Sequence, residues 1–194
     1  YYDSSLEWIG LEKIQIVASM TPSGAIGRYA ISPRLTSIIR FVSLSYPEKD
    51  QLQIVFNEIL KVTLSRDFSD HPVWKLPQNI NILTQAMVDL YDKVVSKFTI
   101  DDQAHYQFTP RDLTLWIIGL LNYGFSSSTD ASELLDVICY EAKRIFKDRL
   151  VSDLAAYDTI EASMLRQFEQ FGYVINSKAE PSVFTSLSGI TLNT

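Results

Sequence analysis

The sequence predicts a mainly α-helical chain, with about five helices that follow a short segment of two strands and loops. Two observations predict this fold class. From Pro47 onward the apolar residues recur with a period near 3.6, which places them on one face of a helix. Before Pro47 they alternate or run together over short stretches, which is typical of strands. With 46% apolar and 21% charged residues among 194, the chain has the composition of a globular protein with a core of its own.

The first part of the chain contains the two predicted strands. Residues 12–19 (EKIQIVAS) alternate partly and then become fully apolar, as in a buried strand, and residues 40–45 (RFVSLS) are a second short predicted strand with Phe41, Val42 and Leu44 at its apolar positions. Between them, the turn-rich TPSGAIG precedes a short predicted helix, with Ser32 as its N-cap and Pro33 at its first position. Two strands do not make a stable sheet alone. We therefore expect this segment either to be the end of a larger α/β domain or to pack firmly onto the helices.

Five helices are predicted in the rest of the chain. The third has the clearest start, because Thr109 can cap it, Pro110 takes its first position and Asp112 lies three residues past the cap. The fourth is expected at about residues 131–150 and the fifth at about residues 159–171. The residues expected to face inward, in chain order, are Leu52, Val55, Phe56, Ile59 and Leu60; Ile80, Leu83, Met87, Tyr91, Val94 and Phe98; Leu113, Trp116, Ile117 and Leu120; Leu134, Ile138, Ala142, Ile145 and Phe146; and Ile160, Met164, Leu165 and Phe168.

Charge and composition exclude several classes of function. The net charge of −6 argues against a broad nucleic-acid interface, because phosphate binding needs clustered lysines and arginines. Cys139 is the only cysteine, which excludes an internal disulfide and indicates a reducing compartment. No apolar run approaches the ~18 residues that span a bilayer, and no signal peptide opens the chain. The chain does not begin with methionine, and we expect it to be a piece of a longer protein.

The usual catalytic patterns are missing from the sequence. His71 and His105 lie 34 residues apart in predicted loops, with no glutamate at metal-ligand spacing, so we expect a structural or solvated role for each. Cys139 falls in an amphipathic helix and is expected to be a small buried hydrophobic residue. The pair Asp101–Asp102 predicts a solvated turn. The chain contains neither a G-x-S-x-G motif nor a glycine-rich phosphate loop.

Arginines are the more informative residues. Arg111 falls in the first turn of the third predicted helix, where free N–H groups and the helix dipole favour an anion. A phosphate would partner both the helix and the arginine, whereas the alternative is a salt bridge to Asp112 or another acidic residue. Arg28 and Arg34 follow the loop after a predicted buried strand, which is where α/β sheets place functional groups. For these two, ordinary exposed surface charge is the alternative.

Three stretches of the chain resemble dynein heavy chains, which are AAA+ ATPases. They are IQIVASMTPSGAIGRYAISPRLTSIIRFVSLSYPEKDQL, then KFTIDDQAHYQFTPRDLTLWIIGLL, which contains HY-x-F-x-x-RDLT-x-W, and then YEAKRIFKDRL, which contains EA-x-R-x-F-x-D-R-L. The resemblance covers about residues 12–150. The first stretch most resembles the ciliary class, cytoplasmic dynein 2, and its P-x-x-x-x-G-R loop resembles the third AAA+ unit of the ring.

This resemblance implies a division of the chain into three parts. Residues 1–46 would be the end of an AAA+ large α/β subdomain, with two strands of an incomplete sheet. Residues 47–175 would be the helical lid subdomain. Residues 176–194, which are rich in Ser and Thr, would be an extended connector towards the next AAA+ unit.

The resemblance also implies roles for individual residues. Thr21 occupies the sensor I position, which is often asparagine; threonine still donates a hydrogen bond but is shorter, which puts efficient hydrolysis at this unit in question. Arg34 matches the arginine finger that reaches the nucleotide of the preceding unit. Arg111 matches sensor II, which contacts the phosphates of its own unit's nucleotide. Arg28 matches a recurrent arginine to which we assign no role.

ATP or ADP with Mg²⁺ is the implied cofactor of the intact unit. The Walker A loop and the Walker B strand, which hold the phosphates and the metal, would lie before the first residue of this chain. We therefore expect the chain alone to bind no cofactor and to hydrolyse no ATP, although its parent would be an ATP-hydrolysing motor. Turnover by the chain that Arg111→Ala abolishes would contradict this expectation.

The implied function is to sense bound nucleotide and to couple neighbouring units of a microtubule motor in retrograde intraflagellar transport. The implied partners are the neighbouring AAA+ units, microtubules through a distant stalk, and the intermediate and light chains of the parent, with no nucleic acid and no membrane. The cytoplasm and the cilium would be its location. The alternative is a helical protein-interaction domain that does not depend on nucleotide, in which the arginines pair with surface carboxylates.

Overall fold

A computed structural model describes residues 2–10, 12–20, 29–125, 129–172, 186–187 and 190–191. The chain divides into two units, Tyr1–Ser45 and Tyr46–Thr194, and each is described by itself.

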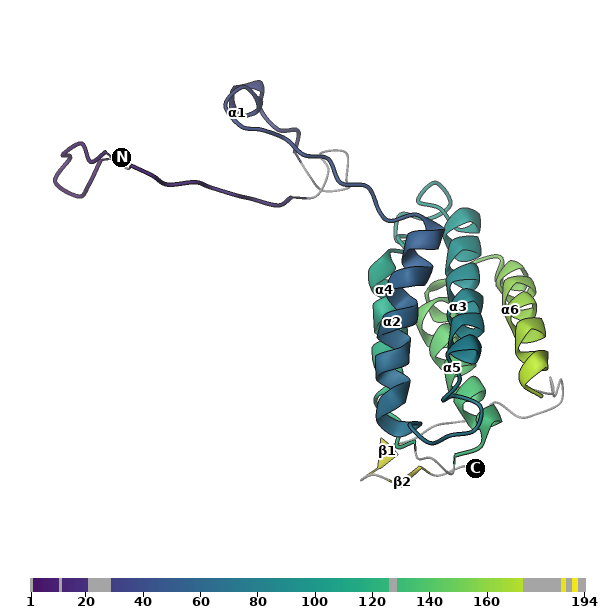
Figure 1. The fold of residues 1–194 in the computed structure, drawn as a ribbon. Helices are drawn as coiled ribbons and strands as arrows, with labels where there is room; N and C mark the ends of the chain where they lie inside the picture. Colours follow the sequence, from purple (N-terminus) through teal and green to yellow (C-terminus); the bar gives the residue numbers. More distant parts are fainter. Residues whose placement is uncertain are drawn as a thin grey trace. The chain divides into compact units, whose positions relative to one another are not determined.

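The first unit contains one short helix among its described residues. This helix, α1, spans Pro33–Thr36, and Ser32 Oγ caps it by accepting a hydrogen bond from the Leu35 N–H at 3.3 Å, as predicted (Figure 1). An isolated antiparallel bridge joins Tyr2 and Trp8, whose rings pack edge to face with centroids 5.4 Å apart. None of the described side chains of this unit is buried. The unit therefore has no core within the part that the structure describes.

The two strands predicted in this unit do not form, and that prediction is wrong for this structure. Residues 12–20 and 40–45 have no strand, and their apolar side chains face solvent: Ile16, Val17 and Leu44 are each more than 85% exposed. A strand is stable only when a neighbour satisfies its N–H and C=O groups and covers one of its faces. Neither segment has such a neighbour among the described residues.

The second unit is a helical bundle. Its helices are α2 (Lys49–Asp67), α3 (Pro77–Lys97), α4 (Pro110–Leu120), α5 (Ala131–Ile145) and α6 (Leu154–Phe168), with 3-10 turns η1 (Lys147–Arg149) and η2 (Glu169–Phe171). A short antiparallel pair, β1 (Ser186–Leu187) and β2 (Ile190–Thr191), follows in the sequence. Helix α3 packs between α2 and α6, and α4 packs against α5 and α2 (Figure 1). The mainly α-helical fold class is confirmed.

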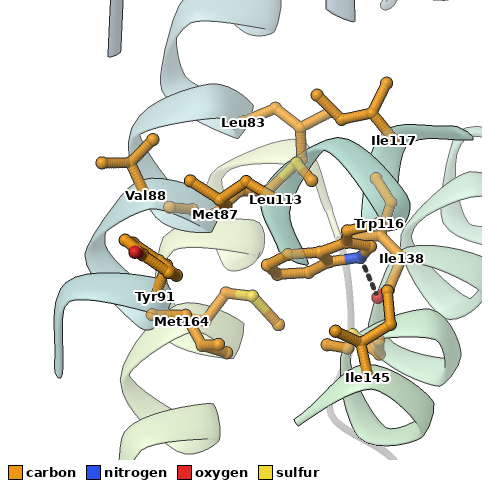
Figure 2. Close-up of a cluster of buried hydrophobic side chains, with 14 of the residues drawn as sticks. Leu83, Met87, Val88, Tyr91, Leu113, Trp116, Ile117, Ile138, Ile145 and Met164 are labelled. Atoms are coloured by element: carbon orange, nitrogen blue, oxygen red, sulfur yellow. Dashed lines mark hydrogen bonds between the residues drawn. The ribbon is translucent and has the colours of Figure 1, made fainter. Parts of the chain in front are cut away.

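The core of the bundle is built around Trp116 of α4 (Figure 2). Its indole N–H donates a 3.0 Å hydrogen bond to the backbone oxygen of Ile138 in α5, so the ring fixes one helix on the other. Met87 of α3 and Met164 of α6 belong to the same buried cluster. The inward positions predicted for the second, third and fourth helices are all buried.

Three helix predictions need correction. Val55 and Ile59 of α2 are exposed, because α2 buries the narrower i, i+4 row that begins with Leu52 and Phe56. The fourth helix ends at Ile145 and tightens into η1, and the fifth begins at Leu154 rather than at 159. Among the described residues no helix is both long and apolar enough to cross a membrane.

Candidate functional site

Arg111 is the second residue of α4, and the local sequence explains why the helix starts there. The Thr109 N–H donates to Oδ2 of Asp112 at 2.7 Å, the Thr109 side chain caps the first turn in return, and Pro110 takes the first helical position. This is the capping box that the spacing of Thr109 and Asp112 predicts. It fixes the backbone on both sides of Arg111.

The side chain of Arg111 has no protein partner in the part of the chain that the structure describes. Arg111 is exposed, and its guanidinium makes no hydrogen bond or ion pair there. The predicted alternative, a salt bridge from Arg111 to Asp112, does not form, because the carboxylate of Asp112 pairs with Arg149 at 2.9 Å. Adjacent residues of a helix do not face each other, which is the physical reason. Arg111 therefore presents its positive charge to solvent at the positive end of a helix.

An anion fits this arrangement. Pro110 has no N–H, and the N–H groups of Thr109 and Asp112 already donate to Oδ2 of Asp112 and to the Thr109 carbonyl, so the helix contributes mainly the positive end of its dipole. An arginine in the same turn adds a fork of donors that binds a phosphate in two places at once. The arrangement is thus chemically suited to a phosphate or carboxylate group.

Arg149 connects this helix start to a distant part of the chain. One of its nitrogens, Nη1, donates to Oδ1 of Asp112, and the other, Nη2, donates to the backbone oxygen of Gln107, both at 2.9 Å. Its guanidinium carbon also lies 4.5 Å from the ring centre of Phe108. The pairing of Asp112 with Arg149 spans 37 residues of sequence.

Further contacts join the same two segments. The Tyr106 hydroxyl accepts the backbone N–H groups of Val151 at 2.9 Å and Ser152 at 3.4 Å, and Nε2 of His105 donates to the Arg149 carbonyl at 3.1 Å. Burial raises the pKa of the Tyr106 phenol, but the hydrogen bonds from Val151 and Ser152 outweigh burial, so that the net pKa is lowered. These contacts hold residues 105–112 and 149–152 together, and we call the two segments the joint.

The other predicted site residues lie elsewhere. Arg34 belongs to α1 in the first unit, is exposed, and its side chain has no hydrogen bond or ion pair among the described residues. Thr21 and Arg28 lie outside the described residues. Arg34 and Arg111 thus belong to different units.

The histidines and the cysteine have structural environments. His71 is buried. Its Nδ1 accepts the N–H groups of Val73 and Trp74 at 3.2 Å each, so the proton of the ring is on Nε2, which donates to the Thr129 carbonyl at 3.0 Å. Burial raises the pKa of the Cys139 thiol, which keeps it protonated and unreactive. Among the described residues no group of three or more His, Cys, Asp or Glu side chains could hold a metal ion.

Sequence reasoning missed the role of Arg149. It noted KDRL only as part of a motif, because no local rule pairs residues 37 positions apart. A signal was present nonetheless: the two unusual motifs, HY-x-F-x-x-RD and EA-x-R-x-F-x-D-R-L, contain most of the residues of the joint. Two such motifs in one chain suggest two segments that meet.

Similarity to known proteins decides the family. A family model described as "Dynein heavy chain, ATPase lid domain" matches residues 55–156, just over half of the chain. The chain belongs to the dynein lid family. The matched residues include α3, α4, α5 and η1, and with them Arg111, Asp112 and Arg149.

Curated relatives of this dynein lid agree. A protein named cytoplasmic dynein 2 heavy chain 1 from Tripneustes gratilla is 47% identical over 157 residues, which are 80% of this chain and 4% of the relative. Proteins of the same name from Homo sapiens and Chlamydomonas reinhardtii are 42% identical over 171 residues and 35% identical over 153 residues, or 86% and 79% of this chain. The chain spans only 3–4% of the length of these relatives.

Proposed function

We propose that this dynein lid senses the nucleotide bound by its own ATPase unit, and that Arg111 contacts the phosphates. The observation that carries the proposal is the exposed guanidinium of Arg111 in the first turn of α4, which has no partner among the described residues. The Asp112 carboxylate of the same turn already binds Thr109 and Arg149, so a nucleotide phosphate would be the anionic partner of Arg111. ATP, when bound, brings the phosphate charge; the residues of this chain bind and orient it.

The wider context of the proposal rests on resemblance. The relatives named above are cytoplasmic dynein 2 heavy chains, and the P-x-x-x-x-G-R loop resembles the third AAA+ unit. We place the chain in a microtubule motor of retrograde intraflagellar transport, in the cytoplasm and cilium. Its neighbours there would be the other AAA+ units of the same heavy chain, with the microtubule bound through a distant stalk and with intermediate and light chains attached.

The remaining parts of the chain have proposed places in the same unit. Residues 1–46 would complete a large α/β subdomain whose other strands, with the Walker A and Walker B segments and the magnesium ligand, come from the parent. Such strands would cover the apolar side chains of residues 12–20 and 40–45 that are exposed here. In that subdomain Thr21 would be sensor I and Arg34 the arginine finger. Residues 47–175 would be the lid and residues 176–194 the connector.

Substitution of Arg111 in the full-length heavy chain tests the proposal. Hydrogen–deuterium exchange of the peptide that covers residues 107–120, followed as ATP is added, reports binding at this unit rather than elsewhere in the ring. We expect Arg111→Ala to weaken binding about tenfold to a hundredfold, as the loss of a charged hydrogen bond does. Arg166→Ala is the matched control, because Arg166 is also an exposed helical arginine. An unchanged midpoint for Arg111→Ala would favour the protein-interaction alternative.

A further inference from the structure

Arg149 and Arg111 are two arginines with different tasks at one helix start. We propose that Arg149 is a positioning residue for Arg111: it binds the chain on both sides of Arg111 and so aims the guanidinium that reads the nucleotide. The proposal rests on the proposed function of Arg111 and adds to it a residue that touches no nucleotide.

The first step is the grip on the helix. Arg149 Nη1 lies 2.9 Å from Oδ1 of Asp112, while Oδ2 of the same carboxylate accepts the Thr109 N–H at 2.7 Å. One oxygen of the carboxylate therefore binds the cap residue Thr109, and the other binds Arg149, which we call the clamp. Asp112 is 8% exposed, so its charge needs a partner close by.

The second step is the grip on the approach to the helix. Arg149 Nη2 donates to the backbone oxygen of Gln107 at 2.9 Å, and the guanidinium carbon lies 4.5 Å from the centre of the Phe108 ring. The guanidinium of Arg149 thus contacts residues on both sides of Arg111: Gln107 and Phe108 come before it in the chain, and Asp112 comes after it. Because the guanidinium is rigid, these contacts fix the direction in which α4 leaves its preceding loop.

The third step is the anchoring of Arg149 itself. Within η1, Lys147 pairs with Asp158 of α6 at 2.6 Å, and the Arg149 carbonyl accepts from His105 at 3.1 Å. Arg149 therefore belongs to a turn that an ion pair to α6 and a hydrogen bond from His105 hold in place. Arg111 has no comparable support, since its own side chain has no partner among the described residues. Its direction depends on its backbone, which the capping box and Arg149 hold together.

A set of variants in the full-length heavy chain tests this inference. It comprises Arg149→Met, Arg111→Ala, the double variant, and Lys61→Met as the control, which removes a cation and an exposed ion pair within α2 but no support of Arg149. The probe is ATP, and the readout is the midpoint of ATP-dependent protection in the peptide of residues 107–120. Thermal unfolding of each variant is measured alongside.

We expect Arg149→Met to raise the ATP midpoint about tenfold while Arg111 is present and to leave it unchanged in the Arg111→Ala background, because residues that act through one another are not additive. Lys61→Met should leave the midpoint unchanged, because Lys61 supports neither Arg149 nor the start of α4. Equal shifts in both backgrounds, or no shift, would overturn the role of Arg149. No effect of Arg111→Ala itself would instead overturn the proposed function.

A milder variant covers the case in which Arg149→Met does not fold. Arg149→Lys keeps the charge but has no planar fork, so it can hold Asp112 or Gln107 but not both in the observed geometry. We expect an ATP midpoint between those of the unaltered chain and Arg111→Ala. A midpoint equal to that of the unaltered chain would show that charge alone suffices and would contradict positioning by the fork.

Discussion

Among single residues, Glu161 of α6 is the carboxylate that burial affects most clearly. It is 7% exposed, and Lys143 of α5, the nearest cation, has its nitrogen 3.5 Å from Oε1. Burial raises the pKa of Glu161, and Lys143 and Lys147 oppose that rise only in part, while Asp158 adds to it. The folded chain therefore holds the proton of this carboxyl more tightly than the unfolded chain does.

The contribution of Glu161 to stability should consequently fall as pH rises past the ordinary glutamate pKa of 4.5 and level off above the raised pKa. We expect Glu161→Gln to be more stable than the unaltered chain at about pH 8, with a difference that shrinks towards about pH 4. Urea midpoints across this range measure it. Glu58→Gln, on an exposed side chain of α2, is the control and should follow the unaltered chain. A less stable Glu161→Gln at about pH 8 would mean that the pairing with Lys143 outweighs burial.

Residues also show how far the sequence alone can reach the candidate site. The position of Arg111 in a first turn could be predicted, because Thr109, Pro110 and Asp112 specify that turn locally. The partner of Asp112 could not, since the choice between Arg111 and Arg149 depends on tertiary packing. Thr21 and Arg28 lie outside the described residues, so their predicted roles stay predictions.

Among the elements, α4 and α5 approach each other closely at Gly119. A Cβ at this position would collide with Oε2 of Glu141 and lie 2.8 Å from its Cδ. Glu141 cannot easily move away, because its carboxylate accepts the Tyr123 hydroxyl at 2.9 Å and two Arg144 nitrogens at 2.6 and 3.0 Å. Glycine thus lets a buried carboxylate lie directly against a neighbouring helix.

Gly119→Ala should therefore destabilise the bundle by about 1–3 kcal/mol, the usual cost of overpacking. This loss is expected even though alanine favours a helix over glycine by about 1 kcal/mol. Urea denaturation of the chain measures the difference. Gly124→Ala is the control, since a Cβ there meets nothing within 4 Å, and it should change stability by less than about 0.5 kcal/mol. A stabilised Gly119→Ala would show that Glu141 yields freely.

Elements differ in how well their sequences predict them, for a physical reason. Helix α4 satisfies its hydrogen bonds within itself and carries its own cap, so a local pattern was sufficient to predict it. The predicted strands at 12–19 and 40–45 needed partners that no local pattern supplies, and they did not form. For α2 the period was right, but which side faces the bundle depends on α3 and α4, so Val55 and Ile59 were misplaced.

On the scale of the whole molecule, the two units differ in what holds them together. The second unit has a continuous core of buried side chains from all five of its α-helices. The described part of the first unit has none, and its apolar residues are exposed. Segments without buried contacts or protected hydrogen bonds open at little cost in free energy. We therefore expect proteases to cleave the first unit much faster than the second.

Brief trypsin digestion of the chain should cut after Lys13, Arg34 and Arg40 before it cuts within the helices of the second unit. Mass spectrometry would then find a protected fragment that begins after Arg40. The same digestion in denaturing urea is the control and should cut throughout. In the full-length heavy chain, where we propose that the first segment joins a complete sheet, these three sites should be protected. Early cleavage within α3 or α5 of the chain would contradict the stability assigned to the bundle.

The joint between residues 105–112 and 149–152 also has a consequence for how the protein is made. During synthesis the capping box of Thr109 and Asp112 can form as soon as that turn leaves the ribosome, because its parts are three residues apart. The contact between Asp112 and Arg149 can form only after Arg149, 37 residues later, has been synthesised. Its formation also has to offset the loss of chain entropy when the loop between the two residues closes. The start of α4 is thus first shaped by its own sequence and given its final direction only after most of the bundle has been translated.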